Sequence, residues 1–80
     1  MKILFAIYKT DVWLSTSSKK LISIVDDKSI IENLIVEYII KNNLENLSND
    51  DRSNLLYIFQ TQGREDNFQI DEVILNELID

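Results

Sequence analysis

Residues 29–43 read SIIENLIVEYIIKNN, and this is the only stretch of the 80-residue chain long and apolar enough to form the spine of a core. At about 100° per residue, its main apolar side chains fall within one half-turn, and the charged ones lie outside it. The pattern predicts an amphipathic helix that packs across a small sheet, with Leu34 in the core. The apolar face consists of Ile30, Ile31, Leu34, Ile35, Tyr38 and Ile39.

Polar residues mark both ends of this helix. Ser29 and Glu32 have the spacing of a capping box, in which the serine oxygen accepts a helical N–H and the glutamate reaches back to the cap. Asp26 and Asp27 precede it, where the helix dipole stabilises carboxylates. Residues 42–43 are two asparagines, which commonly end helices.

Three segments have the two-residue period of β-strands. In residues 2–9 both faces are apolar, which predicts a central strand. Residues 10–18 form a hydroxyl-rich hairpin loop, and residues 20–25 return as an antiparallel strand. In that strand the alternation sets residues 21, 23 and 25 against residues 22 and 24. Residues 67–74 supply the third strand, and a slip in its pattern at residues 71–73 predicts a bulge or the strand's end.

A second, shorter helix is expected over residues 49–60. Ser48 and Asp51 repeat the capping-box spacing at its start. The QTQG segment at residues 60–63 is expected to stop the helix, because its side chains can serve the last carbonyls, and Gly63 can take a left-handed conformation. The predicted fold is therefore a single α+β domain over residues 1–80, with order ββααβ and two helices packed on a three-stranded, mainly antiparallel sheet. The inward-facing residues of the second helix are expected to be Leu55, Leu56, Ile58 and Phe59.

Composition argues against several function classes. The chain has no histidine and no cysteine, so the usual proton carrier, the strongest side-chain nucleophile and thiolate metal ligands are missing. No calcium loop of the D-x-D-x-D-G type is present, and one glycine does not make a phosphate-binding loop. The sequence predicts a protein without enzymatic activity, cofactor or tight metal site.

The charge is unevenly distributed. Residues 1–25 carry four lysines and one aspartate, a net +3, whereas residues 26–80 carry four basic and thirteen acidic groups, a net −9. An acidic surface of this kind keeps a small protein soluble, and it also favours a larger basic protein as partner over nucleic acid. The apolar run at residues 3–8 is too short for a signal peptide, which predicts a cytoplasmic protein that does not enter the membrane.

Several residues are candidates for contacting a partner. Trp13 lies in a polar loop, where an exposed indole would be a binding anchor and a folded-back indole would cover the sheet edge. Val36 and Ile40 lie outside the main helix face, and we expect the second helix to cover them; uncovered, they would form an apolar patch. The predicted contact residues are Tyr8, Asp11, Trp13, Val36, Ile40, Glu65 and Asp66.

Four motifs carry a resemblance to known proteins: IYKTDVW at residues 7–13, L-S-x-D-D at 47–51, Q-T-Q-G at 60–63 and IDEV…NEL at 70–78. Together they resemble a group of small bacterial and phage proteins of uncharacterised function, often found in prophages and other mobile elements. The resemblance covers nearly the whole chain and carries no catalytic residue. It implies an anti-CRISPR inhibitor in the cytoplasm of a bacterial host, acting stoichiometrically on an RNA-guided, RNA-targeting effector.

Two other functions stay open at this point. One is a homo-oligomeric interaction module, paired through a sheet edge or through Val36 and Ile40. The other is weak RNA binding through the N-terminal lysines, with an aromatic side chain as a stacking surface.

Overall fold

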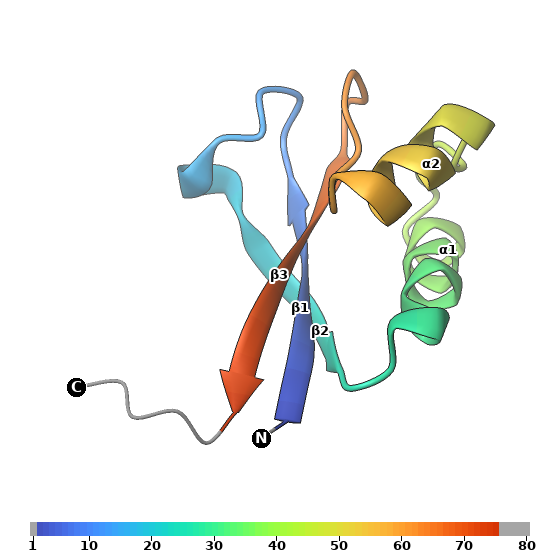
Figure 1. Cartoon of the computed structure of the whole chain (residues 1–80). Helices are drawn as coiled ribbons and strands as arrows, with labels where there is room; N and C mark the ends of the chain where they lie inside the picture. Colours follow the sequence, from blue (N-terminus) through green and yellow to red (C-terminus); the bar gives the residue numbers. More distant parts are fainter. Residues whose placement is uncertain (1, 76–80) are drawn as a thin grey trace.

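The computed structural model describes residues 2–75, which form a three-stranded sheet with helices on one of its faces (Figure 1). The α+β class and the order ββααβ are as predicted. The elements are β1 (Lys2–Thr10), a 3₁₀ turn η1 (Thr16–Ser18), β2 (Lys20–Val25), a 3₁₀ turn η2 (Lys28–Ile30), α1 (Ile31–Lys41), α2 (Asn49–Tyr57) and β3 (Asn67–Leu75). Neither described helix is long and apolar enough to cross a membrane.

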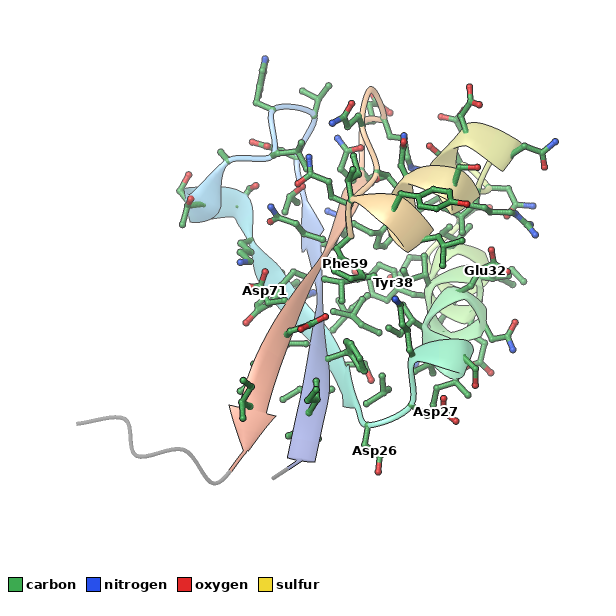
Figure 2. All side chains as sticks on the ribbon, in the orientation of Figure 1. Asp26, Asp27, Glu32, Tyr38, Phe59 and Asp71 are labelled. Carbon is green, nitrogen blue, oxygen red and sulfur yellow. The ribbon has the colours of Figure 1, made fainter. Side chains whose placement is uncertain are left out.

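The strand order β2-β1-β3 places β1 in the centre, and both pairings are antiparallel. The prediction that β1 is central is confirmed, because a strand with two apolar faces is best protected between two neighbours. Phe5 and Ile7 are buried beneath the helices, whereas Ala6 is buried on the other face. Figure 2 shows the same division: Tyr38 and Phe59 lie between sheet and helices, and Asp71 lies on the far side.

The irregularity of the sheet lies in β2 and not in β3. Ile7 pairs with Ser23 and Tyr8 pairs with Leu21, so Ile22 is the extra residue of a bulge. The predicted strict alternation of β2 is therefore wrong, and Leu21 and Ile24 share the face turned away from the helices. The predicted slip in residues 71–73 is also wrong, because β3 pairs with β1 in continuous register as far as Leu75.

The core lies between the sheet and α1. Among the described residues, ten buried apolar side chains form one cluster, and α1 contributes one row of it: Ile31, Ile35 and Ile39. Leu34 and Val36, on either side of this row, are half-buried against the cluster. Ile40 is 74% exposed, so the expectation that α2 covers it is wrong. The buried stripe of α1 is thus narrower than the apolar face seen in the sequence.

The start of α1 differs from the predicted capping box. Asp27 accepts hydrogen bonds from the backbone N–H of Ser29 (2.9 Å) and from its hydroxyl (2.8 Å), so the serine side chain caps nothing. Asp27 caps the 3₁₀ turn instead, and α1 follows with Ile30 in the cap position. The predicted end is confirmed, because Asn43 has a left-handed φ of 57°.

The start of α2 is a complete capping box, as predicted. The Ser48 hydroxyl accepts from the backbone N–H of Asp51 (3.1 Å), and the Asp51 carboxylate accepts from the N–H of Ser48 (2.9 Å). The helix ends at Tyr57 instead of residue 60, because Phe59 takes a left-handed φ of 58°. Leu55 is buried and Phe59 half-buried against the core as predicted. The other two residues expected to face inward, Leu56 and Ile58, are exposed.

The QTQG segment serves β3 instead of the helix end. Thr61 is fully buried, and its hydroxyl accepts from the backbone N–H of Phe68 (2.9 Å). Gln60 forms a bridge with Gln69, so this segment runs along the outer edge of β3. Gly63 has the predicted left-handed conformation, with φ 72°.

Candidate functional site

The most exposed aromatic side chain at the loop end of the sheet is that of Trp13. It lies in the loop between β1 and β2 with 81% of its surface accessible, and its neighbour Val12 is also exposed. The alternative of a tryptophan folded back over the sheet edge is therefore wrong, and the binding anchor stays a prediction. An exposed indole is a side chain of the type that anchors protein interfaces, so Trp13 stays a candidate contact residue.

The Trp13 loop is held in shape by one carboxylate. Asp11 accepts from the backbone N–H of Trp13 (3.1 Å), from the backbone N–H of Ser15 (3.0 Å) and from the hydroxyl of Ser15 (2.9 Å). The hydroxyl of Ser18 in turn accepts from the N–H of Asp11 (3.0 Å). The predicted contact residue Asp11 thus supports the loop from within, and the indole is presented on a preorganised turn.

A buried amide ties this loop to the rest of the fold. Asn67 is fully buried at the start of β3, and its side-chain amide donates to the backbone carbonyls of Asp11 (3.1 Å) and Val12 (3.4 Å). Its amide oxygen accepts from the hydroxyl of Thr61 (2.9 Å). Asn67 therefore fixes the Trp13 loop against the turn that precedes β3.

That turn is anchored by a buried arginine. The Arg64 guanidinium forms an ion pair with Asp51 (2.9 Å) and donates to the backbone carbonyls of Asn46 (2.9 Å), Glu45 and Asp66 (2.8 Å). Its guanidinium carbon also lies 5.6 Å from the ring centroid of Phe68, a cation–π contact. The Arg64 side chain thus joins the start of α2, the segment before α2 and the turn that leads into β3, so its role is structural.

Two predicted acidic contacts lie at the same end of the sheet as Trp13. The register pairs Thr10 with Asn67, so residues 11–13 and 64–66 are neighbours at this end, as Figure 1 shows. Glu65 is exposed, and Asp66 is paired with Lys9 (2.9 Å). We refer to Val12, Trp13, Glu65 and Asp66 as the loop surface.

The other predicted contacts lie elsewhere. Tyr8 is half-buried on the sheet face opposite the helices, and the Lys19 ammonium lies 4.3 Å from its ring centroid. Lys19 also pairs with Asp71 (2.6 Å), so Tyr8 is covered and not part of the loop surface. Val36 packs against the core, and Ile40 is exposed on α1. The structure therefore brings Asp11, Trp13, Glu65 and Asp66 together and separates the remaining three.

Sequence reasoning missed the two buried residues that hold the segments of this site together, Asn67 and Arg64. Their types carry no periodic signal, and only the return of β3 alongside β1 brings them under the loop. Three or more potential metal-ligating side chains do not gather anywhere within residues 2–75. Comparison with known proteins finds no matching family model, curated protein or solved structure, so the resemblance in the motifs stays a prediction. Its N-E-L motif lies outside the described residues.

The hydrogen bonds to Asp11 predict how the loop responds to acid. They lower the pKa of this carboxyl below its ordinary value of 3.8, chiefly through the backbone N–H of Ser15. A carboxyl whose pKa is lower in the folded than in the unfolded state stabilises the folded state at pH values above its unfolded pKa. This contribution is lost as the pH falls through the folded pKa. We expect Trp13 fluorescence to be constant from neutral pH to about pH 4 and to change only below 3.8. In Asp11→Asn this transition should be absent while circular dichroism still reports the folded sheet; a persisting transition would assign it to another group.

Proposed function

We propose that this protein is a stoichiometric inhibitor that binds a basic surface on a larger nucleic-acid-handling protein, namely an RNA-guided, RNA-targeting CRISPR effector. The observation that carries the proposal is the exposed Trp13 on a loop held by Asp11 and Asn67. Binding energy in protein interfaces concentrates in such aromatic anchors, and a preformed loop loses little conformational entropy when it docks.

Charge supports a basic partner. The chain has a formal net charge of −6, and Glu65 is an exposed carboxylate at the same end of the sheet as Trp13. Positive channels that hold guide or target RNA are complementary to a surface of this sign, and complementary charge speeds association and excludes acidic partners. An acidic protein seated in such a channel would block RNA by occupying its place.

The arrangement of the lysines favours a protein partner over RNA. Direct RNA binding would draw on Lys9 and Lys19, yet Lys9 pairs with Asp66 and Lys19 pairs with Asp71. Two of the four N-terminal lysines are therefore already neutralised by carboxylates. The remaining positive charge is small against the repulsion from the acidic surface.

The test is a binding and inhibition assay with matched aromatic variants. We expect the protein to be captured by a guide-loaded RNA-targeting effector and to reduce its cleavage of target RNA at equimolar amounts. Trp13→Ala should weaken capture roughly 30-fold, which corresponds to a hot spot of about 2 kcal/mol. The matched control is Tyr57→Ala, because Tyr57 is 78% exposed but lies on α2.

Two further readouts can contradict this proposal. A charge-assisted complex should weaken as salt rises from roughly 0.1 to 0.5 M, since screening shortens the reach of charge to a few ångströms. Binding that is indifferent to salt, or equal loss in the Trp13 and Tyr57 variants, would argue against the loop surface. If no basic protein is captured from nuclease-treated host lysate and phage plaque assays show intact CRISPR protection, the inhibitor proposal is wrong.

A further inference from the structure

The two outer edges of the sheet are protected differently. Along β3, the backbone N–H of Ile70 donates to Phe59 (2.8 Å), and the N–H of Thr61 donates to Phe68 (2.9 Å). The same strand carries Asp71 and Glu72, whose charges disfavour pairing with another strand. By contrast, β2 pairs only with β1 in the part of the chain that the structure describes. Its outer backbone groups are thus available to a further strand.

Apolar side chains flank this open edge on both faces. On the face opposite the helices, Leu21 and Ile24 are 48% and 55% exposed. On the helix face, a groove lies between β2 and α1, lined by Ile22, Ser23 and Ile40 among others. Lys20 at the start of β2 is the strand's one charged side chain, and the exposed residues that follow it, Leu21 and Ile24, are apolar.

The bulge makes the pattern of β2 symmetric about its own middle. Leu21 and Ile24 share one face, while Ser23 lies opposite Ile7 on the other face and the extra residue, Ile22, packs against the core on that same face. When two copies of β2 run antiparallel about a twofold axis between residues 22 and 23, Leu21 of one copy lies opposite Ile24 of the other. Side chains opposite each other in the new strand pair then lie on the same face of the sheet. In a regular strand, a twofold axis between two residues would instead set residues from opposite faces across from each other.

We propose that β2 is a self-association edge, through which two copies of this chain form a twofold-symmetric dimer with a continuous six-stranded sheet. The charges next to the edge are compatible with a second copy, because Glu37 and Lys41 both line the groove and carry opposite charges that sum to zero, so two copies brought together there do not repel each other. The loop surface lies at the end of the sheet and shares no residue with the β2 edge. The dimer is therefore independent of the proposed function and presents two copies of Trp13.

Backbone pairing of two six-residue strands is a small interface by itself. Specific interfaces bury at least about 1,000 Å² in total. The side chains on both faces of the edge must therefore contribute, and Ile40 on α1 extends the apolar area on the helix face. This predicts a dimer that forms with increasing concentration instead of one that is required for folding.

The first experiment measures mass against concentration by analytical ultracentrifugation, from roughly 1 µM to 1 mM. We expect a monomer–dimer equilibrium in the full chain. Ile24→Lys should raise the dissociation constant at least about tenfold, because it places an ammonium group against apolar residues of the second copy. Val73→Lys is the matched control, because Val73 is exposed on the same face of the sheet but lies on β3.

The second experiment uses the absence of native cysteine to test the register. Leu21→Cys and Ile24→Cys, mixed and oxidised, should form a disulfide-linked heterodimer in excess of the yield from Leu21→Cys mixed with Val73→Cys. Cross-linking of the first mixture supports the antiparallel pairing with these two residues opposed. Neither substitution is expected to unfold the protein, since both side chains are largely exposed.

Several outcomes would overturn the proposal. A monomer throughout the concentration range, with equal cross-linking in both mixtures, means that β2 does not self-associate. A dimer that Val73→Lys disrupts and Ile24→Lys leaves intact places the interface elsewhere. A monomer whose β2 edge is taken up by a strand of a different protein also refutes the second copy as the occupant.

Discussion

Replacing Arg64 with alanine should lower the free energy of unfolding by about 3–5 kcal/mol, because it leaves the Asp51 carboxylate buried without its cation. The stability of a domain of this size is on the order of 5 kcal/mol, so the variant should be close to its unfolding midpoint in buffer alone. Urea denaturation followed by circular dichroism measures the loss. Arg64→Lys should also be poorly tolerated, since an ammonium group cannot serve carbonyls in the directions that the guanidinium reaches.

A surface ion pair at the same end of the sheet provides the control for Arg64. Lys9→Ala breaks the ion pair with Asp66, in which each side chain is 27% exposed. It should lower the free energy of unfolding by no more than about 1 kcal/mol. In the double variant Arg64→Ala, Asp51→Ala, the loss should be smaller than the sum of the two single losses, because no unpaired charge remains. Additive losses would show that Arg64 acts through its backbone contacts and not through Asp51.

Replacing Ile35 with alanine should cost about 2–5 kcal/mol, because its side chain is fully buried at the centre of the α1 row. Leu34, which the sequence placed in the core, is only half-buried, so Leu34→Ala should cost clearly less. The comparison between the two variants tests which stripe of α1 faces the sheet. Thermal and urea melts of both proteins measure it directly.

A substitution at the exposed end of α1 provides the reference for the Ile35 and Leu34 variants. Ile40→Ala removes a side chain that is 74% exposed and should change stability by less than about 0.5 kcal/mol. If Leu34→Ala proved as costly as Ile35→Ala, the helix would be rotated relative to the sheet. The small effect of Ile40→Ala is expected in dilute solution, where the chain is monomeric; a larger cost at high protein concentration would agree with a second copy that covers Ile40.

The arrangement of the sheet could be predicted from the sequence because it depends on a property of one strand. Both faces of β1 are apolar, and only a central position protects both. The bulge in β2 could not be predicted, since Ile22 becomes the extra residue only through the register with Ile7 and Tyr8. A local pattern reports what a segment favours and does not report how it is offset against its neighbour.

At the starts of the helices, too, one local pattern predicted the structure and another did not. Ser48 and Asp51 cap α2 as their spacing predicts. Ser29 fails to cap α1 because Asp27, two residues earlier, takes both its hydroxyl and its backbone N–H. Two capping motifs competed within one short segment, and spacing rules do not rank them.

For the candidate site, the sequence identified the indole and the acidic residues but not their support. Trp13 stands out by type alone, whereas its exposure depends on the turn that Asp11 closes. Asn67 and Arg64 act across more than fifteen residues of chain, on Asp11 and Glu45 respectively. Contacts of that range depend on the fold as a whole, so no short motif could have revealed them.

The central position of β1 also has a consequence for how the chain folds. Its register joins Lys2 to Leu75, so one side of β1, the first of the described strands, stays unpaired until the last described strand has left the ribosome. Pairings between such distant parts of a chain form slowly, because a long loop must close before any contact compensates for the lost entropy. During that interval the nascent chain exposes an apolar strand with an open edge, which is the kind of surface that chaperones bind and that aggregates recruit.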